Sequence, residues 1–274
     1  MSSTLSAAWA RRLNTLQLVL VGIFLLAPVV WMVLASFKQS SDVIAYPPTL
    51  LFTPTIENYR ALIETTPFLS YAVNSIIVTV GSTTLGIVFG VPAAFVISWT
   101  RVSWPAVLTL AARMVRGGLF LLPWYILFRN LGMIGSYWPL ILSHDVITMP
   151  IVIWILLPYF DGIPRSIYEA AQVDGCSVTR VLWRIALPLG GSGVAIAAIL
   201  AFVFSWNFFL FVLVLSTSDT KTMIAASFNF VGEGSTRWGV LMAVATLIAL
   251  PPLMLAMVVQ RWLVAGLTLG AVKG

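Results

Sequence analysis

The sequence is short of the residue types on which most enzymes and metal sites depend. It has a single cysteine, Cys176, so an internal disulfide is impossible. Its single histidine, His144, leaves too few nitrogen and sulfur ligands for the usual metal sites. Charged residues make up only 9% of the 274 positions. With one His, one Cys and no evident Ser/His/Asp set, the sequence offers no catalytic constellation. This argues against an enzyme, including one whose active site would lie within a membrane.

In contrast to charged residues, long apolar runs are frequent in the sequence. Hydrophobic residues make up 60% of the chain, and its mean hydropathy is +1.01. Apolar runs of about 18 residues or more recur and show no period-two alternation, which favours membrane-spanning helices over an outer-membrane barrel. The sequence therefore predicts an all-α integral membrane protein with six transmembrane helices. We expect these spans at about Leu13–Ser36, Phe68–Ser98, Trp104–Phe128, Tyr137–Tyr159, Gly190–Leu215 and Trp238–Leu263.

Lysine and arginine are distributed unevenly between the two ends of these spans. One side carries eight of them, namely Arg11, Arg12, Arg101, Arg165, Arg180, Arg184, Arg261 and Lys273. The other carries five, namely Lys38, Arg60, Arg129, Lys221 and Arg237. Because cytoplasmic flanks carry the excess, both termini are expected in the cytoplasm of a multi-pass protein of the inner, or cytoplasmic, membrane. The net charge of +6 then reflects flanks beside anionic membrane lipids, with no nucleic-acid partner.

The expected organisation is a cytoplasmic N-terminus at 1–12, a transmembrane domain at 13–265 and a cytoplasmic tail at 266–274. Between the fourth and fifth spans lies a polar loop, 160–189, which holds three arginines and three acidic residues from Asp161 to Arg184. Pro164 suits a first helical position, and Gly175 can end that helix in a left-handed conformation. Ser177 can cap a second short helix, whose continuation Pro188 restricts. Two short helices at an angle are predicted, with an ordinary connecting loop as the alternative.

The polar loop carries a long motif. Glu169-Ala170-Ala171, followed by Gly175 and then by Ile185-x-Leu187-Pro188, resembles the EAA loop of binding-protein-dependent ABC importer permeases. Further segments are similar to the permeases that serve sugars and sn-glycerol 3-phosphate, and especially to the maltose-type second permease subunit. These segments are Glu57-Asn58-Tyr59, Asn74-Ser75, Trp206-Asn207, Phe209-Leu210 and the tail 265–274. The resemblance covers essentially the whole chain.

The resemblance implies a type I ABC importer permease fold with a cytoplasmic coupling helix in the polar loop. It also implies a second permease subunit, two copies of an ATP-binding subunit and an extracytoplasmic substrate-binding protein as partners. ATP and magnesium would be bound by the ATP-binding subunits and no cofactor by this chain, which has no Gly-x-x-x-x-Gly-Lys-Ser/Thr run. The transported solute would be a sugar, an oligosaccharide or a glycerophospho compound.

Within the loop, the resemblance assigns the contact with the ATPase subunit to a short set of residues. Glu169 would make the polar contact, Ala170 and Ala171 would allow close packing, and Gly175 would permit the turn. The remaining coupling residues are Asp174, Ile185, Leu187 and Pro188. The tail would reach between the ATPase subunits, with a frayed terminus as the alternative.

Two spans depart from the family pattern. In the fifth, Trp206-Asn207-Phe208-Phe209 lacks the usual carboxylate after the asparagine. We expect Trp206, Asn207 and Phe208 to belong to the substrate pathway, although Asn207 could equally serve helix–helix hydrogen bonding. In the third, Arg113 and Arg116 lie inside an apolar span, where an arginine normally faces a partner or a water-filled cavity.

The fourth span offers a partner for these arginines. A rise of about 1.5 Å per residue puts Arg116 about 18 Å from Trp104 and Asp145 about 12 Å from Tyr137, and so at one level near the midplane. An ion pair between Asp145 and Arg116 is predicted, with Arg113 as the alternative partner. The pair is either structural or part of the translocation pathway. A secondary transporter driven by an ion gradient, with this pair as its coupling site, is the alternative function.

The remaining expectations concern His144 and the outward-facing loops. His144 is interpreted as a helix residue that meets a local partner, with a proton-relay role as the alternative. Gly232-Glu233-Gly234 could form a flexible projection against the binding protein, with a solvated loop as the alternative.

Overall fold

The computed structural model describes residues 2–114, 118–231 and 236–271, with side chains described for 13–109, 111, 118–231 and 236–258. Over these ranges the chain is helical and contains no strand. The α-helices are α1 (Ser2–Ser36), α2 (Ser40–Val43), α3 (Glu57–Thr65), α4 (Phe68–Thr100), α5 (Trp104–Met114), α6 (Gly118–Asn130), α7 (Trp138–Asp161), α8 (Arg165–Val173), α9 (Val178–Val181), α10 (Leu187–Leu189), α11 (Gly191–Trp206), α12 (Leu210–Leu215), α13 (Met223–Ser227) and α14 (Trp238–Ala271). A π-helix, Leu182–Ala186, joins α9 to α10, and a 3₁₀ turn, Phe228–Phe230, follows α13.

The predicted all-α membrane protein is confirmed, but not all of the six predicted spans are seen as single continuous helices. Over the described ranges, four helices are long and apolar enough to cross a membrane: Leu13–Ser36, Phe68–Thr100, Trp138–Asp161 and Trp238–Val258. A fifth candidate is the pair Val178–Leu189 and Gly191–Trp206, which bends by 82° at its break. Of the predicted third span, the structure describes α5 and α6, which lie on either side of the undescribed residues 115–117. The predicted fifth span is divided into α11 and α12.

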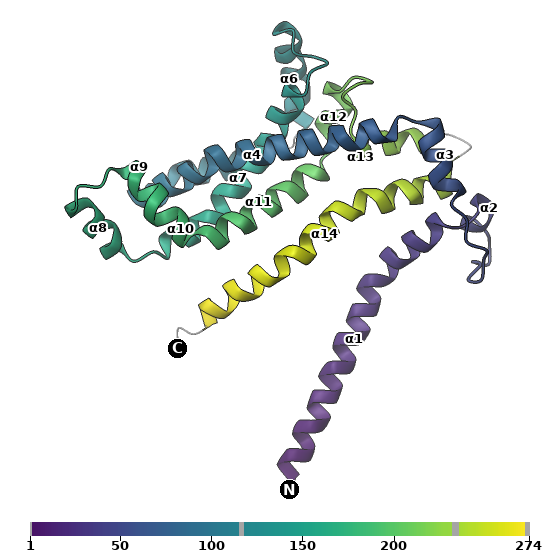
Figure 1. Cartoon of the computed structure of the whole chain (residues 1–274), viewed down its shortest axis with the longest axis horizontal. Coiled ribbons are helices and arrows are strands. Elements are labelled where there is room, and N and C mark those ends of the chain that lie inside the picture. The colour runs from purple at the N-terminus through teal and green to yellow at the C-terminus, as the bar shows by residue number, and fades with distance from the viewer. Residues whose placement is uncertain (1, 115–117, 232–235, 272–274) are drawn as a thin grey trace. The chain divides into compact units, whose positions relative to one another are not determined.

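The chain forms two compact units, and α4, α7 and α11 are the centre of the larger one, Phe68–Ala226 with Leu250–Gly274. These three helices lie side by side (Figure 1). Glycines bring α4 close to α7: a Cβ added at Gly90 would lie 2.7 Å from Cγ1 of Val152, and one at Gly86 would lie 2.9 Å from Oγ1 of Thr148. Small residues at such contacts let apolar helices pack tightly where lipid removes the hydrophobic driving force.

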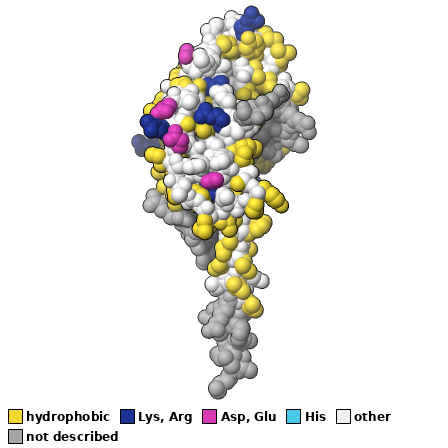
Figure 2. All heavy atoms as spheres, turned by 90° about the vertical axis from the view of Figure 1, so that its right-hand side faces the viewer, with side chains coloured by type: hydrophobic (Ala, Val, Ile, Leu, Met, Phe, Trp, Pro, Cys, Tyr) yellow, Lys and Arg dark blue, Asp and Glu magenta, His cyan; other side chains and the backbone are white. Residues whose placement is uncertain are grey.

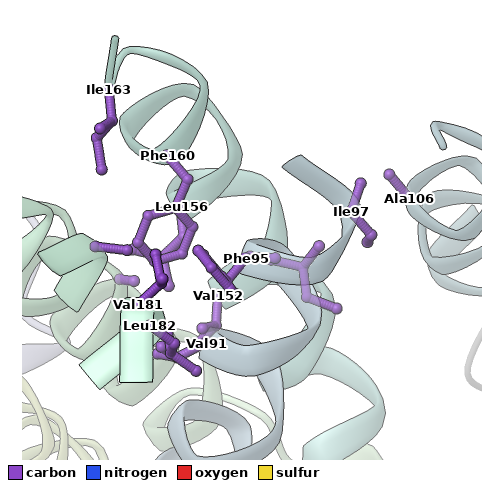
Figure 3. Close-up of a cluster of buried hydrophobic side chains, with 14 of the residues drawn as sticks. Val91, Phe95, Ile97, Ala106, Val152, Leu156, Phe160, Ile163, Val181 and Leu182 are labelled. Carbon is purple, nitrogen blue, oxygen red and sulfur yellow. The ribbon is translucent and has the colours of Figure 1, made fainter. Parts of the chain in front are cut away.

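Buried side chains fill the space between these helices. Phe95 of α4, Val152, Leu156 and Phe160 of α7, and Val181 of α9 point into one cluster (Figure 3). Outside this cluster, α4 is linked to α11: the hydroxyl oxygens of Ser82 in α4 and Ser205 in α11 are 2.7 Å apart. Apolar packing and one polar link therefore hold α4, α7 and α11 as a group.

The second unit consists of Met1–Pro67 and Ser227–Ala249. Figure 2 shows mainly hydrophobic side chains over the described part of α1, as expected of a helix that crosses lipid. Beyond α1, the side-chain amide of Asn58 in α3 donates to the carbonyl oxygens of Ser36 at 2.8 Å and Lys38 at 2.7 Å. The ammonium of Lys38 is buried, donates to the carbonyl of Thr49, and lies 4.4 Å from the ring centre of Trp31. These contacts fold the segment after the first span back onto its end.

Candidate functional site

The polar loop forms a short helix at one end of the α4, α7 and α11 group (Figure 1). This helix, α8, runs from Arg165 to Val173, with Pro164 as the residue before it, one position earlier than predicted. Gly175 has a φ of +73°, and its amide donates to the carbonyl of Gln172. Because only glycine adopts this conformation without strain, the predicted role of Gly175 as a helix stop is confirmed.

The second predicted helix is also present. Ser177 caps α9, since its Oγ accepts a hydrogen bond from the amide of Arg180 at 3.3 Å. The helical run then continues past Pro188 to Leu189 and bends at Gly190, so Pro188 does not end it as expected. The intervening π-helix supplies the reason: the amide of Leu187 bonds to the carbonyl of Leu182, five residues back. This wider turn replaces the α-helical geometry in which a proline ring clashes with the carbonyl four residues earlier.

The inner face of α8 is fixed to the ends of the membrane helices by aromatic contacts. Tyr168 is 4% exposed, and its ring centre lies 5.2 Å from Trp99 and 6.1 Å from Phe95. Its hydroxyl donates to the carbonyl of Phe160 at 3.3 Å, and Nη1 of Arg165 donates to the carbonyl of Trp99 at 3.2 Å. Burial and the nearby Asp161 raise the pKa of Tyr168, while Arg165 lowers it, so the hydroxyl stays a hydrogen-bond donor at neutral pH.

The outer face of α8, with the residue that follows it, presents three of the eight predicted coupling residues. Glu169, Ala170 and Asp174 are exposed. Ala171 is different: it is 5% exposed and packs in the chain's own core, so its small side chain serves close packing within this subunit. The helical period explains the split, because positions 168 and 171 share one face and positions 169, 170 and 174 lie away from it.

A groove of about 350 Å³ runs beside α8. Its lining comes from both halves of the loop, namely Ser166, Ile167, Ala170, Ala171, Asp174, Cys176 and Ile185. Ile185 thus joins the predicted coupling residues of α8 at one concave surface. In α10, which follows, Leu187 is half-buried and Pro188 is exposed. The groove therefore brings together four of the eight predicted coupling residues, Ala170, Ala171, Asp174 and Ile185, while Glu169, Gly175, Leu187 and Pro188 are not among its lining residues.

The second candidate site is the break between α11 and α12. Asn207 is exposed, and its side-chain amide donates to the carbonyl of Val203 at 2.8 Å, which closes the end of α11. Trp206 is buried, and its ring stacks on Phe202 at 5.6 Å. The carbonyl of Phe208 lies at the break, where His144 of α7 approaches it with Nε2 at 3.2 Å. Irregular backbone at membrane depth needs such a partner or a water-lined cavity, and here a side chain supplies it.

Asp145 lies on α7 beside His144. Its Oδ1 accepts a hydrogen bond from Oγ1 of Thr148 at 3.0 Å. It lines a cavity of about 520 Å³ together with mainly apolar side chains of α5, α6 and α7. Arg116 lies outside the described residues, and of Arg113 only the backbone, in α5, is described. The ion pair therefore stays a prediction. Gly232, Glu233 and Gly234 also lie outside the described residues.

Several polar contacts of this unit were not anticipated. Sequence reasoning found Asn74-Ser75 only as a family signature, and the structure gives both side chains a function in packing. The amide of Asn74 donates to the carbonyls of Asp219 and Lys221, and Oγ of Ser75 accepts from the amide of Met223. Small polar residues within an apolar helix were the available signal, since such side chains tend to bond across helices.

Comparison with known proteins gives consistent results. A family model described as "Binding-protein-dependent transport system inner membrane component" matches residues 2–269. A probable ABC transporter permease protein of Sinorhizobium fredii is 34% identical, over 99% of this chain and 99% of that protein. The diacetylchitobiose uptake system permease protein DasC of Streptomyces coelicolor is 31% identical, over 93% and 95%. The trehalose/maltose transport system permease protein MalG of Thermococcus litoralis is 30% identical, over 93% and 94%.

The fold agrees with that of a solved transporter. A chain from the crystal structure of a bacterial ABC transporter involved in alginate import matches with a TM-score of 0.70 and 20% identity, over 92% of this chain and 96% of that one. This likeness confirms the predicted ABC importer permease fold. The family model covers nearly the whole chain, and the relatives align over almost their full length. The chain belongs to the family of binding-protein-dependent transport system inner membrane components, the permease subunits of ABC importers.

Proposed function

We propose that this chain forms half of the translocation pathway of an ATP-driven sugar importer and receives the work of ATP hydrolysis through α8. One observation carries the proposal: Glu169 and Ala170 of α8 and Asp174 directly after it are exposed, while Tyr168 fixes the other face of α8 to α4 and α7. A helix held in this way transmits a displacement to the membrane helices without deforming. That is the mechanical property a coupling element requires.

Family membership supports the partners of this proposal. A substrate-binding protein delivers the solute from outside, a second permease subunit completes the pathway, and two ATP-binding subunits bind ATP and magnesium. The excess of lysine and arginine on the α8 side supports an orientation with α8 and both termini in the cytoplasm. In this orientation the exposed face of α8 meets the ATP-binding subunit.

The sugar class of the solute rests on two relatives, one named for diacetylchitobiose uptake and the other for trehalose/maltose transport. The break between α11 and α12 supports it chemically. Asn207 is exposed there and keeps its side-chain oxygen as an acceptor, while Phe208 offers an aromatic face. An amide beside an aromatic ring suits a ligand that combines hydroxyl groups with apolar ring faces.

Site-directed crosslinking in the assembled importer tests the proposal. Cys176→Ser gives a cysteine-free chain, into which Glu169→Cys or Asp174→Cys is then introduced. We expect both cysteines to crosslink to the co-purified ATP-binding subunit, with a yield that changes when ATP is added. The control is Arg129→Cys at the end of α6, which the orientation places on the opposite face of the membrane.

Two results would refute the proposal. One is a crosslink to the ATP-binding subunit from Arg129→Cys and none from the α8 positions. The other is solute uptake by the solitary chain in proteoliposomes under an ion gradient, which would instead support the secondary transporter that uses Asp145 and Arg116.

A further inference from the structure

The larger of the two compact units contains a cavity to which the proposed transport function assigns no role. It has a volume of about 420 Å³ and lies where α4 ends, α5 begins and α7 ends. These are the ends of membrane helices, so the cavity sits at the membrane boundary on the α8 side. Its walls include Ile97 of α4 and Ala106 of α5, which point toward each other (Figure 3).

The cavity changes from apolar to polar along its length. Val107 of α5, and Trp154 and Leu157 of α7, line its apolar part, and Trp154 and Val107 are 36% and 57% exposed. Side chains with that exposure on membrane-spanning helices open the apolar part toward lipid. Ser98, Arg101 and Asp161 line the polar part. A cavity with this gradient matches an amphipathic molecule that lies across the boundary.

The polar part holds one positive and one negative charge. Asp161 accepts a hydrogen bond from Oγ of Ser98 on its Oδ1 at 2.5 Å, which fixes the carboxylate. Arg101 has a φ of +55°, an unusual conformation for a non-glycine residue, and its guanidinium has no hydrogen bond or ion pair to any described residue. A neighbouring cavity of about 300 Å³ shares Ser98, Arg101 and Asp161, so both charges line two cavities, and it is also lined by Arg165.

We propose that this cavity binds a zwitterionic aminophospholipid of the leaflet on the α8 side. Arg101 binds the lipid phosphate, Asp161 accepts hydrogen bonds from the free ammonium, and the first part of an acyl chain lies along Trp154, Val107 and Leu157. Charge complementarity within the first cavity selects this class, because its one arginine and one aspartate match a net-neutral headgroup with separate phosphate and ammonium. Arg165 lines only the neighbouring cavity, and its Nη1 already donates to the carbonyl of Trp99. A choline headgroup has no N–H to donate, and an anionic lipid would place its excess negative charge beside Asp161.

Native mass spectrometry of the complete importer tests this assignment. The complex is delipidated, incubated with phosphatidylethanolamine, phosphatidylcholine or phosphatidylglycerol, and the retained lipid is measured. We expect phosphatidylethanolamine to be retained in preference to both. Asp161→Asn keeps an oxygen for Ser98 but loses the charge, and we expect it to lower the affinity for phosphatidylethanolamine about tenfold and to remove the preference over phosphatidylcholine. Arg101→Gln is expected to weaken the binding of all three lipids.

Matched controls separate the cavity from general surface charge. Asp219→Asn and Arg129→Gln change exposed charges of the same unit that line neither cavity, and we expect both to retain lipid like the unchanged chain. Equal retention of phosphatidylethanolamine and phosphatidylcholine would overturn the proposal. So would preferential retention of phosphatidylglycerol, or unchanged retention by Asp161→Asn in an intact complex. Arg101→Lys, which keeps the charge, must bind phosphatidylethanolamine more tightly than Arg101→Gln if the phosphate is held there.

Discussion

The imidazole of His144 in α7 reaches the backbone carbonyl of Phe208 at the break in the fifth predicted span, with Nε2 at 3.2 Å from the oxygen. Its Nδ1 lies 2.6 Å from the carbonyl of Leu140, one turn earlier on α7. The rings of His144 and Phe208 meet edge to face at 5.5 Å. Both contacts end on carbonyl oxygens, which only accept, so a neutral imidazole donates its single N–H to one of them and only the imidazolium donates to both. In the tautomer with the proton on Nε2, His144 supplies a donor to the carbonyl at the break between α11 and α12.

Replacement of His144 tests this relationship. We expect His144→Phe to destabilise the detergent-solubilised importer by about 1–3 kcal/mol, because the carbonyl of Phe208 loses its partner at a part-buried position. His144→Gln places an amide donor at a similar reach, and we expect it to keep most of the stability. The measurement is the midpoint of thermal unfolding for both variants. Equal loss in both would show that ring packing, and not the hydrogen bond, is what His144 provides.

Sequence reasoning found half of the environment of His144. A local partner was predicted and is confirmed by Leu140. The contact with Phe208 spans 64 positions and ends on a backbone carbonyl, which every residue possesses, so no side-chain pattern signals it. The break itself had a weak signal, since Asn207 can bond to the carbonyl of Val203 and close a helix.

The close contact of α4 and α7 leads to a second prediction. At Gly90 an added Cβ would lie 2.7 Å from Cγ1 of Val152, whose side chain is fully buried. We expect Gly90→Val to cost about 1–3 kcal/mol of stability through overpacking. Gly22 in α1 is the matched control, because no described atom lies within 4 Å of a Cβ added there. Thermal unfolding of the solubilised importer should separate the two, and equal midpoints would contradict the tight α4–α7 contact.

The sequence predicted where helices begin and end better than it predicted breaks within them. The start of α4 at Phe68 and the end of α1 at Ser36 agree with the predicted spans, because hydropathy changes sharply at both places. Hydropathy carries no information on breaks inside an apolar run, so the division of the fifth span into α11 and α12 was missed. Hydropathy is equally uninformative in the polar loop. Ala170 is exposed and Ala171 is buried because of the face on which α8 packs, and hydropathy does not predict that face.

A third prediction concerns the anchoring of α8 by Tyr168. Tyr168→Ala removes a buried ring from the cluster with Phe95 and Trp99, and we expect it to weaken the attachment of α8 by about 3–5 kcal/mol. In the purified importer, this should lower the number of solute molecules transported per ATP hydrolysed. Tyr168→Phe keeps the ring and loses only the hydrogen bond to Phe160, about 0.5–1.5 kcal/mol, so transport should stay close to normal. If Tyr168→Ala transports at an unchanged ratio, rigid attachment of α8 is not required.

The final prediction concerns Gly175, which ends α8 at a φ of +73°. Gly175→Asp adds backbone strain of about 1–2 kcal/mol and a second negative charge beside Asp174, at the turn next to the exposed face of α8. We expect this variant to assemble with its partners, because no described atom lies within 4 Å of a Cβ added there. Solute uptake should be lost while ATP hydrolysis continues, since the displaced turn no longer passes movement to the membrane helices.

Gly132 provides a control with nearly the same backbone geometry. Its φ is +67°, a Cβ added there also meets no described atom within 4 Å, and it lies in the turn after α6, away from α8. Gly132→Asp therefore introduces the same strain and the same charge at a place where the proposal assigns no coupling. We expect its uptake to remain near normal in vesicles with matched amounts of assembled importer. Loss of uptake in both variants would assign the effect to strain alone, and normal uptake by Gly175→Asp would remove the loop from the coupling path.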